Sequence, residues 1–249
     1  MKLHITLMVL AILSCSVALG QGKKAQPAQQ PTAQPAVKEE SKKESVSNSL
    51  LEHYVRKRAV AARWNDYDIV RDAMYDMIIE DPANDSLIAQ LAYLYFDNQK
   101  FPSTVLVCQD LLNRNPKNVQ ALEMAAISYE NLSLLDRALQ SYESLFLLTG
   151  NITSLYKMAF LQFELKRYAE SITNADIMLG KPDVDTMKVQ FNDKDGKPKE
   201  YPVRIALLNL KGMVYKDQAD KVSAKKFFEE ALKLAPDFAP AKQGLDSLK

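Results

Sequence analysis

Residues 205–238 read IALLNLKGMVYKDQADKVSAKKFFEEALKLAPDF, and this stretch decides the fold. Its apolar residues recur at helical spacing, and Pro236 stands near its end. Small residues stand at Gly212, Ala224 and Ala231, among larger ones. Small side chains let two helices approach closely, and large side chains fill the gaps between helix pairs. The stretch therefore predicts a closely packed pair of helices.

Helix-stopping residues like Pro236 recur upstream at a regular interval. The tetrapeptides DPAN at 81–84 and NPKN at 115–118 place two prolines 34 residues apart, and the same step leads on to Gly150. Proline and glycine both stop helices. The whole chain has only seven glycines, which suits helices joined by short connections. A period of 34 residues with a proline near its end indicates repeated helix hairpins and an all-α fold.

Position by position, the chain resembles the tetratricopeptide-repeat (TPR) family, in which positions 4, 7, 11 and 24 of each repeat are bulky and positions 8, 20 and 27 are small. Residues 205–238 match best, although Lys211 stands at position 7. The resemblance implies a TPR solenoid of about five helix-turn-helix repeats. It also places Cys108 in the core, at position 24 of the second repeat. The predicted repeats are 51–84, which is divergent, 85–118, 119–151, 152–185 and 205–238, followed by a capping helix over 239–249.

Residues 186–204, TMKVQFNDKDGKPKEYPVR, break the period between the fourth and fifth repeats. Apolar and polar residues alternate around Asp195-Gly196, which predicts a β-hairpin whose turn favours positive φ. A calcium loop is rejected, because Phe191 and Pro202 would stand where oxygen ligands are required. We therefore expect no metal. The hairpin is either an arm that binds a partner or a patch over the seam between two repeats.

The first twenty residues have a basic start, a short apolar stretch and a small-residue step, which predicts a signal peptide over 1–20 and an exported protein, periplasmic or secreted. Cys15 lies in a sequence that loosely resembles a bacterial lipobox, so it is a candidate lipidation site that would anchor the protein to a membrane. Residues 21–48, rich in Pro, Gln, Lys and Glu, are expected to be a disordered tether. No later segment is apolar enough to be a transmembrane helix.

Composition excludes several functions. The 32 Lys and Arg residues balance the 31 Asp and Glu residues, so no basic face for nucleic acid is expected. Beyond the signal peptide only His53 and Cys108 remain, which argues against Cys-His and Ser-His-Asp catalysis. The nearest pair of carboxylates, Glu123 and Glu130, has a spacing common on any solvated helix. We predict no catalytic residue, no enzyme activity and no cofactor.

The TPR resemblance implies an inner groove lined by the first helix of each repeat. The groove predicted here is aromatic with acidic edges, and the Lys, Arg and Asn set that clamps a terminal carboxylate in chaperone-docking TPR proteins is missing. We therefore expect a protein or peptide partner with apolar anchors and some positive charge. Alternatively, the aromatic residues pack against neighbouring repeats. The predicted groove residues are Tyr93, Phe96, Glu123, Ile127, Glu130, Tyr156, Phe160 and Phe163.

The function that follows is a non-catalytic protein-protein interaction scaffold of the bacterial cell envelope. Two alternatives stay open. One is a lipid-anchored outer-membrane assembly factor, which requires lipidation of Cys15. The other is a self-associating structural module whose repeats bind copies of themselves.

Overall fold

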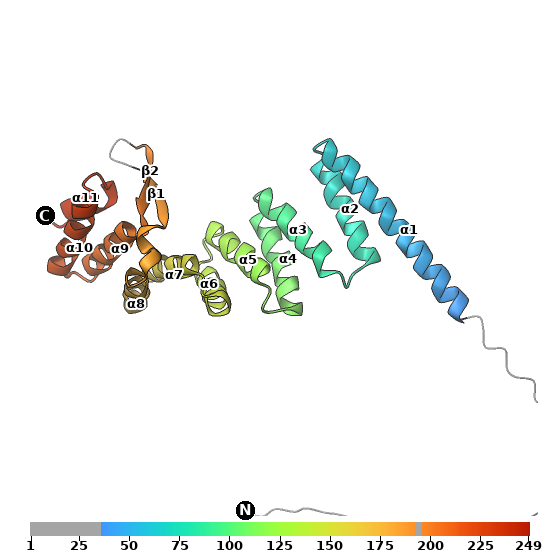
Figure 1. The fold of residues 1–249 in the computed structure, drawn as a ribbon, viewed down its shortest axis with the longest axis horizontal. Helices are drawn as coiled ribbons and strands as arrows, with labels where there is room; N and C mark the ends of the chain where they lie inside the picture. Colours follow the sequence, from blue (N-terminus) through green and yellow to red (C-terminus); the bar gives the residue numbers. More distant parts are fainter. Residues whose placement is uncertain (1–35, 193–195) are drawn as a thin grey trace, which may run out of the picture. The chain divides into compact units, whose positions relative to one another are not determined.

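The structure, a computed structural model, describes residues 36–192 and 196–249, with side chains from residue 46 onward. The chain divides into two units after Glu44, and the packing described below lies within residues 45–249. Figure 1 labels the elements in chain order. They are α1 (Ala36–Arg63), α2 (Tyr67–Glu80), α3 (Asp85–Asp97), α4 (Phe101–Arg114), α5 (Val119–Asn131), α6 (Leu135–Thr149), α7 (Ile152–Glu164), α8 (Tyr168–Leu179), the 3₁₀ turn η1 (Pro182–Asp185), β1 (Lys188–Asn192), β2 (Pro198–Pro202), α9 (Val203–Asp217), α10 (Lys221–Leu234) and α11 (Ala239–Asp246).

The helices form consecutive antiparallel pairs. One pair, α3 with α4, fills residues 85–118, and the pairs α5 with α6 and α7 with α8 follow it. The two strands separate α8 from α9, which pairs with α10, and α11 packs on both of these last helices. The sequence prediction of an all-α repeat fold with a β-hairpin inserted before the fifth repeat is thereby confirmed.

The predicted tether is wrong over residues 36–48, because α1 begins at Ala36 and includes them. Pro35 is the last proline before Pro82. Residues 36–48, AVKEESKKESVSN, contain three Glu and three Lys, which have high helix propensity, and no proline that would conflict with a helix. Low apolar content predicts disorder, whereas the helix propensity of the residues themselves favours a helix here. The signal-peptide and Cys15 predictions lie outside the described residues.

Each helix pair turns through one residue in the left-handed conformation. These residues have φ between 55° and 61°, and none is glycine. In each turn the amide of the next residue donates to a carbonyl five residues earlier at 2.8–2.9 Å, as in a Schellman cap. The same turn at position 15 of every predicted repeat is the clearest sign that the helix pairs are structurally equivalent. The residues are Asn65, Gln99, Ser133, Lys166 and Ala219.

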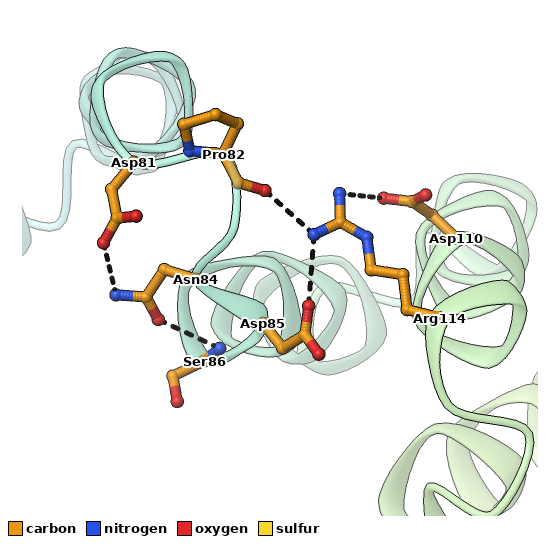
Figure 2. Close-up of polar contacts among 7 residues, drawn as sticks. All are labelled: Asp81, Pro82, Asn84, Asp85, Ser86, Asp110 and Arg114. Atoms are coloured by element: carbon orange, nitrogen blue, oxygen red, sulfur yellow. Dashed lines mark hydrogen bonds and ion pairs between the residues drawn. The ribbon is translucent and has the colours of Figure 1, made fainter. Parts of the chain in front are cut away.

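The link between consecutive pairs is stabilised by polar contacts, which Figure 2 shows for α2 and α3. The Asn84 side chain caps α3 by accepting a hydrogen bond from the Ser86 amide at 3.2 Å. From the end of α4, Arg114 Nη1 donates to the Pro82 carbonyl at 2.8 Å and lies 3.1 Å from Asp85 Oδ1. Arg114, at the end of the second helix of the repeat, thus contacts the turn that precedes the first helix of the same repeat.

The core follows the small and large positions of the repeat. The small residues at position 8, Ala92, Ala126 and Ala159, are completely buried. Cys108 is completely buried too, which confirms that it belongs to the core. At the position where the family pattern is broken, Lys211 is 8% exposed. Its Nζ lies 2.6 Å from Asp176 Oδ1 and 4.3 Å from the centre of the Phe227 ring, so the charge is compensated.

The hairpin pairs β1 with β2 in antiparallel register, from Lys188 opposite Pro202 to Asn192 opposite Pro198. Gly196 has φ of +77°, as predicted for the turn. Both Phe191 and Tyr201 meet the buried ring of Phe238 edge to face, with ring centres 5.1 and 4.9 Å apart. Val189 packs instead on the buried cluster shared by α7, α8 and α9. The hairpin therefore covers the seam between the fourth and fifth repeats, one of its two predicted roles.

Candidate binding surface

A cavity of about 550 Å³ lies over the first helices of the N-terminal repeats, and we name it the Tyr93 cavity. Its walls come from α1, α2, α3 and the start of α5. The Tyr93 side chain is 56% exposed there, with Asp97 one turn further along the same helix. Because Met74 and Ala62 line it together with Arg58 and Asp97, the cavity offers both apolar surface and polar groups.

A second cavity, of about 360 Å³, lies between α5 and α7, and we name it the Phe160 cavity. The rings of Tyr156 and Phe160 stand side by side in it, with centres 4.7 Å apart and planes inclined by 47°. Phe191 of the hairpin contributes a third ring, and Glu164 a carboxylate. Helix α5 connects the two cavities, since Gln120 at its start lines one and Glu130 near its end lines the other.

An ion pair crosses the wall of the Phe160 cavity. Lys157 Nζ lies 2.9 and 3.1 Å from the two carboxylate oxygens of Glu130. The Tyr142 hydroxyl donates to the same carboxylate at 3.0 Å. Burial raises the pKa of Tyr142, and the Glu130 charge raises it further, so this phenol stays a donor. The Glu130 charge is therefore compensated within the protein by Lys157 and Tyr142. In the same cavity, burial raises the pKa of Tyr156 to about 12.

Four of the eight predicted groove residues line these cavities. Tyr93 lies in one, and Glu130, Tyr156 and Phe160 lie together in the other. Tyr156 and Phe160 are half-buried and also pack on the cluster around Leu155, so they combine surface and packing roles.

The other four predicted residues line neither cavity. Phe96 is half-buried against the central core and meets Phe101 edge to face. Phe163 packs near Tyr168, with ring centres 6.1 Å apart. Ile127 is half-buried, and Glu123 is exposed. For Phe96 and Phe163, packing between helices accounts for the aromatic ring.

The structure adds residues that sequence reasoning missed. Lys157 stands at position 6 of its repeat, where the groove pattern predicts nothing, and only the structure pairs it with Glu130. Phe191 belongs to the insertion, outside the repeat register. Arg58 of the divergent first repeat lines the Tyr93 cavity and donates to the Gln90 side chain at 2.5 Å. Its large side chain at a position expected to be small was a signal for this role.

A third cavity, of about 410 Å³, lies on α1 and the start of α2. Its apolar lining includes Trp64, which is 74% exposed, with Val60 and Ile69 beside it. His53 lies at its edge and is exposed. This surface belongs to the first repeat and is separate from the predicted groove.

Over residues 36–192 and 196–249, no three His, Cys, Asp or Glu side chains are grouped so that they could hold a metal ion. Over the same ranges, no helix has the length and apolar character needed to cross a membrane.

An array of antiparallel helix pairs with equivalent turns and a surface formed by the first helices defines a helical-repeat protein. A tetratricopeptide-repeat family model matches residues 205–238, the stretch that decided the fold from sequence. No curated protein matched the sequence.

Solved structures with a similar fold include TPR proteins. YrrB, a TPR protein with an unusual peptide-binding site, superposes with a TM-score of 0.60 at 10% identity, over 78% of this chain and 90% of its own. A tetratricopeptide repeat protein from Parabacteroides merdae ATCC 43184 gives 0.58 at 17% identity, over 80% and 72% of the two chains. MamA gives 0.56 at 13% identity, over 77% and 95%. The chain has the fold of a tetratricopeptide-repeat protein.

Proposed function

We propose that the protein is a non-catalytic interaction scaffold that binds a polypeptide along the surface formed by α3, α5 and α7. The observation that carries this proposal is the pair of cavities joined by α5, each with an exposed or half-buried aromatic residue over apolar walls. Aromatic residues in concave apolar sites are typical anchors for protein partners. The fold shared with YrrB, which has a peptide-binding site, supports the same function.

Tyr93 is the residue that best tests the proposal. A side chain that is 56% exposed beside a cavity contributes little to folding, so a large effect of its removal on partner binding would reflect contact with the partner. A photo-crosslinking amino acid placed at position 93 in cells is expected to give a discrete adduct. The matched control places it at Leu147, which is 84% exposed on α6 and lines a different cavity, outside the proposed groove.

Adducts at position 93 that are absent at position 147, and that weaken when Phe160 is also changed to Ala, support the scaffold. The same adducts at both positions would show nonspecific capture. No adduct at position 93 would count against the groove.

The envelope location rests on the sequence alone. We propose export directed by residues 1–20, with Cys15 as the lipid site only if the protein is anchored. N-terminal sequencing of the protein isolated from its own cells distinguishes these fates. A free terminus near Gln21 supports cleavage of the signal peptide, whereas a blocked terminus and incorporation of labelled fatty acid support the lipid-anchored assembly factor. A mature chain that still begins at Met1 overturns export.

Self-association is a second candidate, and the cavity around Trp64 favours it. A contiguous apolar face on a terminal repeat is a common place for another protein surface to pack. Light scattering on the wild type and on Trp64→Glu tests this candidate. A mass near that of two or more chains that falls to one chain in the variant supports it, and a monomeric wild type rejects it.

A further inference from the structure

We propose that the Phe160 cavity binds the side chain of a lysine or arginine carried by the partner polypeptide. This inference rests on the proposed function, because it specifies what one part of the groove recognises. It follows from three features of the cavity: its aromatic walls, an uncompensated carboxylate and the polarity of α7.

The aromatic walls suit a cation with an apolar stem. Tyr156 and Phe160 lie 4.7 Å apart between ring centres, and Phe191 adds a third ring from the hairpin. The face of an aromatic ring attracts an ammonium or guanidinium group, and this attraction is stronger when the group is partly removed from water. Leu135 and Leu161 complete the apolar lining, against which the aliphatic stem of a long basic side chain can pack.

The charges of the cavity favour a positive ligand. Glu130 is already paired with Lys157, so these two charges largely cancel. Glu164 is exposed, and no ion pair to it occurs among the residues described for this chain. The net charge left for a ligand is therefore that of the Glu164 carboxylate. An acidic ligand would have to compete with Glu130 for Lys157, and it would face Glu164 as well.

The polarity of α7 adds to this preference. Glu164 is the last residue of α7, and the last turn of that helix contains no basic residue. The carbonyls at a helix C-terminus carry partial negative charge, so a carboxylate there is unfavourable for the helix itself. The Glu164 carboxylate and the end of α7 thus both contribute negative charge to a cavity lined by aromatic rings. A bound cation would relieve that repulsion, which gives the site a preference that apolar contact alone would not supply.

Selected peptides can test the inference on the full chain. A phage-displayed library of random peptides is selected against the wild type, and the recovered peptides are synthesised and titrated. Each is compared with a version in which one Lys or Arg is replaced by methionine. The protein variants are Glu164→Gln, which keeps the shape of the site, and Glu229→Gln as the matched control. Glu229 is exposed on α10 and lines neither groove cavity.

We expect recovered peptides to share a basic residue whose replacement weakens binding to the wild type by about tenfold. With Glu164→Gln the same replacement should cost about twofold or less, and Glu229→Gln should behave as the wild type. Peptides that bind without a basic residue, and that bind Glu164→Gln as well as the wild type, would overturn the inference while leaving the scaffold function standing. If replacing the basic residue of the peptide weakens binding equally in Glu164→Gln and in the control variant, the cavity is rejected as the site of recognition. Failure to recover any peptide would overturn both proposals.

Discussion

Gly212 of α9 lies directly against the ring of Phe228 of α10. A β-carbon on Gly212 would stand 2.6 Å from both Cδ1 and Cε1 of that ring, closer than real atoms approach. Phe228 is completely buried, and a β-carbon on Gly244 of α11 would stand 2.5 Å from Cε1 and Cζ of the same ring. The ring is therefore closely packed against both glycines. The two glycines explain how this buried phenylalanine of the fifth repeat fits between three helices.

Gly212→Ala is expected to destabilise the protein by about 1–3 kcal/mol, because the added methyl group overpacks the core. The measurement is the free energy of unfolding from denaturant titration followed by circular dichroism. Gly180→Ala is the matched control. A β-carbon there would make only ordinary contacts, 3.6 Å from the Ile177 carbonyl, and its effect should be neutral or slightly stabilising. Equal stability of the two variants would contradict the close approach.

Ala219→Gly is expected to stabilise the protein by about 1 kcal/mol. Ala219 has φ of +61°, a conformation that costs an L-residue roughly 1–2 kcal/mol and costs glycine almost nothing. Asn65→Gly is the control at the equivalent turn, where φ is +56°. Asparagine tolerates this conformation better than alanine, so the gain there should be smaller. Thermal unfolding of both variants measures the difference, and a larger gain at Asn65 would contradict the argument.

The Cys108 thiol should be unreactive in the folded protein. Burial raises the pKa of Cys108 from 9.0 to about 12, so almost no thiolate forms near neutral pH. In a chain carrying Cys15→Ser, a chromogenic disulfide reagent is expected to label Cys108 rapidly only after denaturant is added. Fast labelling of the native protein would contradict the burial.

The same pKa shift predicts how stability depends on pH. Because the folded-state pKa lies above that of the unfolded chain, the contribution of the neutral thiol is complete below about pH 9. It is lost as the pH rises from 9 towards 12. Cys108→Ala, although less stable at neutral pH, should therefore lose less stability over that range than the wild type. If the stability of the two proteins falls equally with rising pH, the Cys108 thiol is not the cause of this pH dependence.

The repeat register could be predicted from sequence because it depends on a few small residues with a strict spatial role. Ala92, Ala126 and Ala159 recur at position 8, where only a small side chain lets paired helices touch, and all are completely buried. The left-handed turns were not predictable in the same way. Gln99 and Lys166 carry no turn signal of their own, and the conformation is imposed by the packing of the helices they connect.

The candidate site was only partly predictable, because it depends on contacts across repeats and with the insertion. The periodic pattern identified Tyr156 and Phe160 as facing the groove, but it could not separate a ring in a cavity from one that packs between helices, as Phe163 does. Phe191 joins the Phe160 cavity through a hairpin that lies outside the repeat. Its position depends on the packing of the hairpin on Phe238.

The two cavities differ in how far their aromatic residues also support the fold, and this difference is measurable. Tyr93 is 56% exposed, so Tyr93→Ala is expected to change the free energy of unfolding by no more than about 0.5 kcal/mol. Phe160 is half-buried and packs on the cluster that includes Leu155 and Val203, so Phe160→Ala should cost about 2 kcal/mol, below the range for fully buried phenylalanine. Denaturant titration of both variants measures these values. A large loss with Tyr93→Ala would assign that ring to the core and remove the main support for the groove. A negligible loss of stability with Phe160→Ala would instead show that its ring contributes little to folding and is available to contact a partner. If the values separate as expected, partner binding should be tested first with Tyr93, because any loss there can be read without correcting for unfolding.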